Sequence, residues 1–179
     1  PVVMKISSPD ILHKSDVGGV RVDVANAAEV RDTFELIDYR ARRYQPNADI
    51  SGILVQQQAP RGRECLVGVS RDPQFGPLVA FGMGGIYVEV LKGVAFRLAP
   101  ISRAEAEEQV RQIRSFPILA GTRGQAPADL ASVVDTVLRA SQLVTDFPEI
   151  VEMDINPLMV YDQGQGSIVL DARIILAGA

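Results

Sequence analysis

The stretch Glu152-Met-Asp-Ile-Asn-Pro-Leu-Met-Val-Tyr161 is followed by Asp-Gln-Gly-Gln-Gly and then by Ser167-Ile-Val-Leu-Asp-Ala-Arg173. Both flanks alternate in character and contain β-branched side chains, and the segment between them consists of turn-forming residues. The stretch therefore predicts a β-hairpin. Closing this hairpin symmetrically about the middle of the turn places Asn156 opposite Asp171, within one residue.

Asp154 precedes Asn156 by two residues, so the period of two along a strand predicts that both lie on the same face. The hairpin then brings together the carboxylates of Asp154 and Asp171 and the amide oxygen of Asn156. Hard oxygen ligands of this kind suit Mg²⁺ and leave coordination positions for phosphate oxygens. The alternative is that Asp-Ile-Asn-Pro only begins a turn, with Pro157 opening an edge strand.

The remaining chain predicts a mixture of short strands and amphipathic helices. Asn26 with Glu29, and Ser102 with Glu105, have the spacing of capping boxes at helix starts. The pattern predicts strands at 2–6, 20–24, 53–56, 64–69, 78–81, 87–91 and 95–98, and helices ending near 44, 114 and 146. Many neighbouring strands are joined by short connections and are expected to be antiparallel, so the fold class is α+β.

Composition limits the kind of protein. The chain has 179 residues, 47% of them hydrophobic, which is enough for one or two compact units. A formal net charge of −4 without a basic stripe argues against a nucleic-acid partner. One cysteine, Cys65, rules out an internal disulfide and fits a reducing compartment. No apolar run has the length of a membrane span and no signal peptide is visible, so we expect a cytoplasmic protein with no membrane partner.

The chain begins inside an apolar strand, at Pro1-Val-Val-Met-Lys-Ile6, and has no initiating methionine. We therefore expect it to be a fragment of a longer polypeptide.

Two residues near this start are candidates for phosphate chemistry. His13 is the only histidine and lies in a polar loop that ends in glycines, where a neutral imidazole could accept and pass on a group. Lys5 ends an apolar strand and could neutralise a phosphate as a point charge. The alternatives are a surface loop histidine and a lysine that extends to solvent.

Further candidates are polar residues in strand-like runs. The glutamines at 56–58 could hydrogen-bond a base or a ribose, and Arg97 is a possible phosphate ligand. Glu64 and Glu89 are carboxylates that could face a site. The alternatives are solvated glutamines and glutamates, and an arginine held in an ion pair.

A glycine cluster, Gly82-Met-Gly-Gly85, could let backbone N–H groups approach a phosphate closely. It matches neither a Walker loop nor Gly-x-Gly-x-x-Gly, because no Gly-Lys-Ser/Thr follows and a strand comes next. The alternative is a set of hairpin or bulge glycines.

Taken together, the motifs resemble the ATP-grasp domain of the NDP-forming acyl-CoA synthetases, over essentially the whole chain. The resemblance is to the β-subunit type of ADP-forming acetate–CoA ligase, which is related to the succinyl-CoA synthetase β subunit. The motifs that carry it are Val3-Met-Lys-Ile6, His13-Lys-Ser-Asp-Val-Gly-Gly-Val20, Arg71-Asp-Pro-Gln-Phe-Gly-Pro77, Phe81-Gly-Met-Gly-Gly-Ile86, Phe96-Arg-Leu-Ala-Pro100, Asp154-Ile-Asn-Pro-Leu158 and Asp171-Ala-Arg173.

This resemblance implies an ATP-grasp fold, with a mixed, largely antiparallel sheet and flanking helices, that lacks its N-terminal lead-in. It implies a nucleotide-binding small subdomain at 1–57 and a larger subdomain with the metal-binding hairpin at 58–179.

The resemblance also assigns nucleotide-binding roles. Lys5 corresponds to the lysine that contacts the nucleotide phosphates. Gln56 and Gln57 lie at the hinge that holds adenine and ribose, and Glu64 matches a nucleotide-contacting glutamate. Arg97 would add positive charge near the phosphates.

For the chemistry, Asn156 and Asp171 match the two Mg²⁺ ligands, in agreement with the pairing derived from the hairpin. Asp154 matches an acidic residue beside the phosphoryl-transfer site, where a carboxylate near an imidazole would orient the ring and stabilise its charged form. His13 matches the histidine that relays the phosphoryl group. Phosphoryl transfer needs charge compensation and in-line positioning more than covalent help from the protein.

The implied activity is that of an acid–thiol ligase: acyl-CoA + ADP + phosphate ⇌ carboxylate + CoA + ATP. ATP or ADP and Mg²⁺ are the implied cofactors. The CoA-binding and ligase domains, on an α subunit or in a fused chain, are the implied partners, and the complete enzyme is expected to be an oligomer. The fragment alone should not complete the reaction. Two alternatives are a non-catalytic sensor domain of a protein lysine acetyltransferase and a generic carboxylate–amine ligase.

Overall fold

The computed structural model describes residues 1–11, 13–84, 93–122 and 124–178. The chain divides into two compact units, Pro1–Pro60 (unit 1) and Arg61–Ala179 (unit 2). Each unit has its own hydrophobic core, so each is described by itself.

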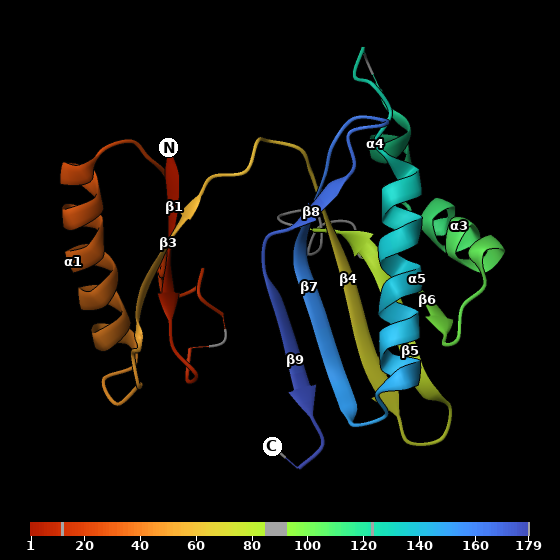
Figure 1. Cartoon of the computed structure of the whole chain (residues 1–179), viewed down its shortest axis with the longest axis horizontal. Helices are drawn as coiled ribbons and strands as arrows, with labels where there is room; N and C mark the ends of the chain where they lie inside the picture. The colour runs from red at the N-terminus through yellow and green to blue at the C-terminus, as the bar shows by residue number, and fades with distance from the viewer. Residues whose placement is uncertain (12, 85–92, 123, 179) are drawn as a thin grey trace. The chain divides into compact units, whose positions relative to one another are not determined.

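Unit 1 is a small antiparallel sheet with one helix on it (Figure 1). Its strands lie in the order β2 (Val20–Val24), β1 (Val2–Ser7) and β3 (Gly52–Gln57). Helix α1 (Ala27–Tyr44) begins at Asn26, whose side chain accepts hydrogen bonds from the backbone N–H groups of Ala28 and Glu29. The predicted helix start is therefore confirmed.

Alternation along β1 decides which residues of unit 1 meet α1. Met4 and Ile6 are buried in the core together with Ile37 and Ala41 of the helix. Lys5 lies between the two buried residues and is only partly buried, so it faces the other side of the sheet. One face of this sheet is therefore core, and the face that carries Lys5 is open.

Unit 2 is a larger antiparallel sheet, with β7 also paired to β9, and all three helices of its described residues contact the same core. In Figure 1, α5 and α3 lie along one face of the sheet. The strand order is β6 (Val94–Leu98), β5 (Gly76–Met83), β4 (Arg63–Asp72), β7 (Ile150–Val160) and β8 (Ser167–Val169), with β9 (Ala172–Leu176) beside β7.

The helices of unit 2 are α3 (Arg103–Gln112), α4 (Phe116–Ala120) and α5 (Leu130–Asp146). The capping box at Ser102 and Glu105 is confirmed. Helix α4 lies between the helices expected to end near residues 114 and 146, in a stretch where the sequence pattern predicted no helix. A proline in the first turn of a helix sacrifices no intrahelical hydrogen bond, so Pro117 starts this turn instead of preventing it.

The core of unit 2 lies between the sheet and these helices. Val67, Val69, Val79 and Phe81 of β4 and β5 are almost fully buried and contact α3 and α5 through their shared core. The residues that alternate with them face away from the helices, and this side of the sheet is called the open face below. The α+β class and the antiparallel pairing predicted from the sequence are confirmed.

Three expectations fall on residues outside the described ranges: the strand at 87–91, Glu89 and Gly85. Along the described part of the chain, no helix has the length and apolar character needed to cross a membrane.

Candidate functional site

The hairpin predicted from the sequence is formed by β7 with β8 and β9, and its register is the expected one. The N–H of Asn156 donates to the carbonyl oxygen of Asp171 at 3.1 Å. Leu158 pairs with Val169 on one side of this contact and Ile155 with Ala172 on the other. Asn156 therefore lies opposite Asp171, as the symmetric closure predicts.

Against its other neighbour, β7 contains a bulge at this point. Cys65 of β4 pairs with Leu158 and Val67 pairs with Ile155, so Leu66 alone lies opposite both Asn156 and Pro157. The strict alternation of faces is interrupted there. Toward β9 the register runs without a shift from Asp154 opposite Arg173 to Asn156 opposite Asp171, so the shared face of Asp154 and Asn156 stays a prediction.

The open face places Asp154 independently of the bulge. Its neighbours Met153 and Ile155 contact the core, so Asp154 points to the other side. Gly68 of β4 lies opposite it on one flank and Arg173 of β9 on the other. Asp154 is therefore on the open face, two residues before the pair formed by Asn156 and Asp171.

The pair formed by Asn156 and Asp171 fits a magnesium site by its chemistry. It offers an amide oxygen and a carboxylate, both oxygen donors, on residues that remain at least partly exposed to solvent. Within the described ranges, no group of three or more His, Cys, Asp or Glu side chains gathers into a cation cage. A site with two protein ligands suits Mg²⁺, which keeps several waters or phosphate oxygens in its coordination shell.

Glu64 lies at one end of β4 and is exposed, opposite Met159 of β7. Because it alternates with the buried Cys65, it belongs to the open face. Its carbonyl oxygen accepts a hydrogen bond from the N–H of Gly84 at 2.7 Å.

The described part of the glycine cluster is explained by close packing of backbone. A Cβ on Gly82 would lie 3.1 Å from a methyl group of Val94, and one on Gly84 would lie 3.2 Å from the carbonyl oxygen of Cys65. The N–H of Gly84 is already bonded to Glu64. These contacts favour the alternative of hairpin glycines at both positions.

Arg97 lies on the side of the sheet that faces the helices. It pairs with the buried Val79 of β5, and its Nη2 contacts the carboxylate of Glu108 in α3 at 3.3 Å. The structure therefore does not bring Arg97 to the open face with Asp154. Its position is that of the alternative, an arginine held in an ion pair.

In unit 1, the register places Gln56 opposite Val3 and Gln57 opposite Val2. Gln56 therefore shares the open side of the small sheet with Lys5, whose cross-strand partners are Leu54 and Val20. Gln57 points to the side of the sheet that α1 covers.

The loop of His13 is fixed at both ends while the imidazole remains exposed. Ile11 and Val17 insert into the core of unit 1. The loop closes through the N–H of Gly19, which donates to the carbonyl oxygen of Lys14 at 2.8 Å. A Cβ on Gly19 would lie 2.6 Å from a methyl group of Ile6, so this position requires glycine. The exposed imidazole of His13 therefore lies between Ile11 and Val17, which are both buried in the core of unit 1.

Asp129, a residue that the sequence analysis did not select, anchors the turn of the hairpin. It is 8% exposed and precedes α5. Its Oδ1 accepts from the N–H of Ser132 at 3.1 Å, and its Oδ2 accepts from Gly164 and Gly166 at 3.0 and 2.9 Å. These bonds, led by that of Gly166, hold the pKa of the Asp129 carboxyl below its usual range.

The position of Asp129 before an apolar helix was a visible N-cap signal. Its hydrogen bonds to the hairpin turn depend on tertiary packing, so no local sequence pattern predicts them. The thiol of Cys65 is fully buried in the core of unit 2, and this burial raises its pKa to about 12, as fits a packing residue.

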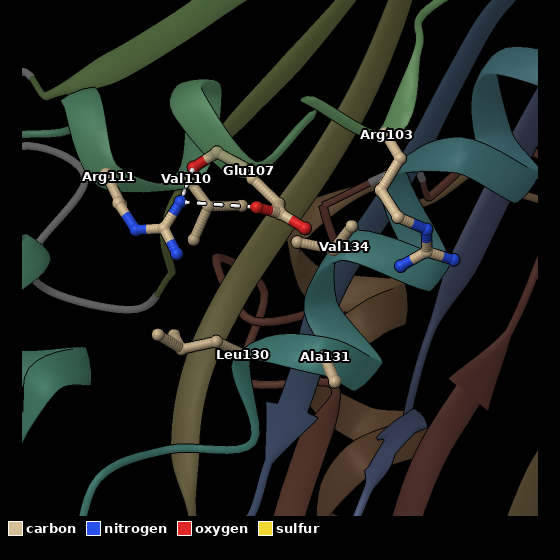
Figure 2. Close-up of a pocket in the computed structure, with 7 residues that line it drawn as sticks. All are labelled: Arg103, Glu107, Val110, Arg111, Leu130, Ala131 and Val134. Carbon is tan, nitrogen blue, oxygen red and sulfur yellow. Dashed lines mark hydrogen bonds and ion pairs between the residues drawn. The ribbon is translucent and has the colours of Figure 1, made fainter. Parts of the chain in front are cut away.

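A separate pocket of about 220 Å³ lies between α3 and α5 (Figure 2). Its floor is apolar, with Val110, Leu130 and Val134. Its charged side chains form ion pairs: Arg111 contacts Glu107 at 3.5 Å, and Arg103 contacts Asp135 at 2.8 Å. The pocket is on the helical side of the sheet, away from the open face.

A family model described as an ATP-grasp domain matches residues 1–176. The chain belongs to the ATP-grasp domain family. The resemblance drawn from the motifs is thereby confirmed.

Curated relatives of this ATP-grasp domain are ligases. The chain is 49% identical over 176 residues to the β subunit of the ADP-forming acetate–CoA ligase I of Pyrococcus furiosus, covering 98% of this chain and 75% of the relative. It is also 49% identical to the ADP-forming acetate–CoA ligase I of Archaeoglobus fulgidus, of which it covers 25%. The domain thus occurs both as most of a subunit and as a quarter of a longer chain.

The acetyl-coenzyme A synthetase 1 of Ca. Korarchaeum cryptofilum, crystallised with coenzyme A and Ca-AMPCP, is 46% identical at a TM-score of 0.92, over 98% of this chain and 76% of that one. Another structure of that enzyme holds coenzyme A and Mg-AMPPCP, with its phosphohistidine segment pointing towards the nucleotide-binding site (42% identity, TM-score 0.81, 98% and 76% coverage). The ATP-grasp fold is confirmed, and the sensor alternative gains no support from these relatives.

Proposed function

We propose that this chain is the nucleotide- and phosphate-handling domain of an ADP-forming acyl-CoA synthetase, which converts acyl-CoA, ADP and phosphate to carboxylate, CoA and ATP. The observation that carries the proposal is the paired Asn156 and Asp171, in the predicted register, within a chain that matches a ligase β subunit over 98% of its own length. Residues 1–57 are the nucleotide-binding part and 58–179 carry the metal-binding hairpin. The boundary after Pro60 between the compact units supports this division.

In unit 2, Asn156 and Asp171 would hold Mg²⁺, which when bound offsets the negative charge of the phosphates. Asp154 supplies a carboxylate beside the reacting phosphoryl group. Glu64 contacts the nucleotide from the same open face. Arg97 is not retained as a phosphate ligand, because its guanidinium is held by Glu108 on the helical side.

In unit 1, Lys5 contacts the nucleotide phosphates, and Gln56 on the same side of the sheet contacts adenine or ribose. Gln57 stays in the proposal as the neighbouring hinge residue and contributes through its backbone, since its side chain points to the α1 side. His13 accepts the phosphoryl group on a neutral ring nitrogen and passes it to ADP. An exposed imidazole on a pinned loop suits such a carrier.

The partners in this proposal are CoA-binding and ligase domains, on an α subunit or in a longer chain, and the complete enzyme is an oligomer. The relatives support this assignment, because one is a subunit and another is a fourfold longer chain. We place the protein in the cytoplasm. Its one cysteine is a free, buried thiol, which agrees with a reducing compartment.

The test measures ATP formed from acetyl-CoA, ADP and phosphate by the complete enzyme. Asp171→Ala should lower turnover at least 100-fold, because it removes a metal ligand. Asp162→Ala is the matched control in the same hairpin: this side chain is half exposed and pairs with Arg63 on the helical side, so turnover should change less than twofold. Unchanged turnover with Asp171→Ala would make the metal assignment wrong.

A further inference from the structure

The described strands of unit 2 carry four arginines, and three of them face the helices. Arg63 contacts Asp162 at 2.9 Å and the carbonyl oxygen of Ala126. Arg71 donates to the carbonyl oxygens of Ile150 and Val144 at 3.0 and 2.7 Å. Arg97 contacts Glu108 at 3.3 Å, as described above. All three link strands to loops or helices on the covered side of the sheet.

Arg173, the fourth, lies on the open face. The register of β9 places it opposite Asp154, and cross-strand partners share a face. Its Nη2 lies 2.5 Å from the carboxylate of Glu152, two residues along the strand from Asp154. The side chain is 34% exposed, so the guanidinium is reachable from solvent.

A cation at this place would reduce the repulsion between the carboxylates and the phosphate oxygens of a bound nucleotide. Arg173 contacts Glu152, pairs with Asp154 across the strands and follows Asp171, which directly precedes β9, by two residues. A nucleotide polyphosphate brings roughly three or four more negative charges, each of which is repelled by a carboxylate a few ångströms away. Mg²⁺ held by Asn156 and Asp171 would offset part of the phosphate charge.

We propose that Arg173 contacts the phosphoryl oxygens of the nucleotide bound at the Asn156–Asp171 pair. The inference rests on the proposed function and adds to it the phosphate ligand that Arg97 does not provide. Asp171 directly precedes β9, and two residues of extended chain span at most roughly 7 Å, which is within reach of an arginine side chain. Arg173 would therefore lie within reach of a phosphate at a metal ion held by Asp171.

A guanidinium can serve both neighbours at once. It has five N–H donors in a planar fork, and the contact with Glu152 involves one of its three nitrogens. The carboxylate of Glu152 then contacts one edge of the fork, and another edge can contact phosphate oxygens in a bidentate arrangement. In this arrangement Glu152 contributes only a small part of the orientation of the guanidinium, and Arg173 is the group that contacts the nucleotide.

The test compares binding of Mg·AMPPCP and of adenosine to the complete enzyme by calorimetry. The variants are Arg173→Met, Arg173→Lys and Glu152→Gln. A half-exposed ion pair contributes little to folding, so all three should fold, and their melting temperatures are measured to check this. Arg173→Met should weaken Mg·AMPPCP binding about 10- to 100-fold and leave adenosine binding within twofold. Arg173→Lys should recover part of the loss.

Glu152→Gln distinguishes two roles of Arg173, a contact with phosphate and a structural ion pair. If Arg173 contacts phosphate, this variant should keep Mg·AMPPCP binding within about threefold of wild type. An equal loss in Glu152→Gln and Arg173→Met, or an equal loss for adenosine and Mg·AMPPCP, would make Arg173 a structural ion-pair residue and overturn the inference. Wild-type affinity of Arg173→Met for Mg·AMPPCP would overturn this inference but not the proposed function. Failure of the wild-type enzyme to bind Mg·AMPPCP would overturn the proposed function as well.

Discussion

Replacing Asp129 by alanine should destabilise unit 2 and loosen the turn that joins the two strands of the metal-binding hairpin. The change removes the N-cap of α5, which typically contributes about 1 kcal/mol. It also removes two hydrogen bonds from the N–H groups of Gly164 and Gly166 to a carboxylate, each contributing about 1.5 kcal/mol or more. Because neighbouring interactions are not additive, we expect a loss of about 2–4 kcal/mol in the free energy of unfolding.

The loss should also depend on pH. The pKa of the Asp129 carboxyl is lowered in the folded protein, so its contribution is complete above the unfolded pKa of about 3.9. The contribution then falls as the pH drops through the lower folded pKa. Asp129→Ala should therefore differ most from wild type near neutral pH, and the two unfolding curves should converge in acid.

Urea unfolding of the complete protein at neutral and acidic pH measures this difference. Hydrogen exchange of the Asn156 and Gly166 amides reports on the hairpin itself, and exchange at both should accelerate in the variant. Asp135→Ala is the matched control: it lies on the same helix and contacts Arg103 across an exposed surface, so its effect should stay within about 1 kcal/mol. An ordinary surface substitution changes the free energy of unfolding by roughly 0.5 kcal/mol or less. A difference of that size between Asp129→Ala and wild type would refute the role of this residue.

Three further predictions concern other parts of the chain. Gly19→Ala should destabilise unit 1 by about 1–3 kcal/mol in thermal unfolding, since the added Cβ would lie 2.6 Å from Ile6; an unchanged melting temperature would contradict the packing described. Gln109→Leu should cost about 1–3 kcal/mol, because its buried Nε2 donates to the carbonyl oxygens of Val79 and Ala95 at 2.9 Å; a more stable variant would contradict this. Glu108→Gln should leave Mg·AMPPCP affinity within twofold, because Arg97 faces the helices; a tenfold loss would return Arg97 to the phosphate site.

The hairpin shows what a sequence can and cannot specify. Its turn residues and alternating flanks fix the register, so the opposition of Asn156 and Asp171 could be predicted. The bulge against β4 depends on the neighbouring strand, which lies some 90 residues earlier in the sequence and has no local signal in the hairpin. The face of a residue beyond such a bulge cannot be read from spacing alone.

Arg97 and Arg173 show the same limit. Both arginines occupy short strands among apolar neighbours, and their sequence contexts do not tell which face is covered. The packing of α3 against β6 decides that Arg97 meets Glu108, while β9 at the other side of the sheet leaves Arg173 on the open face. Conversely, helix caps such as Ser102 with Glu105 depend on residues three apart, so the sequence predicts them directly.

The most direct test of the central claim is phosphoryl labelling of the complete enzyme. It is incubated with Mg²⁺ and γ-labelled ATP, and wild type is compared with His13→Asn and Asp171→Ala. Phosphohistidine is labile in acid and stable in base. We expect a label with this stability on His13 in the wild type, lost in both variants, together with loss of turnover. Nucleotide binding without label on His13 in the wild type would contradict the relay and leave His13 a surface loop residue.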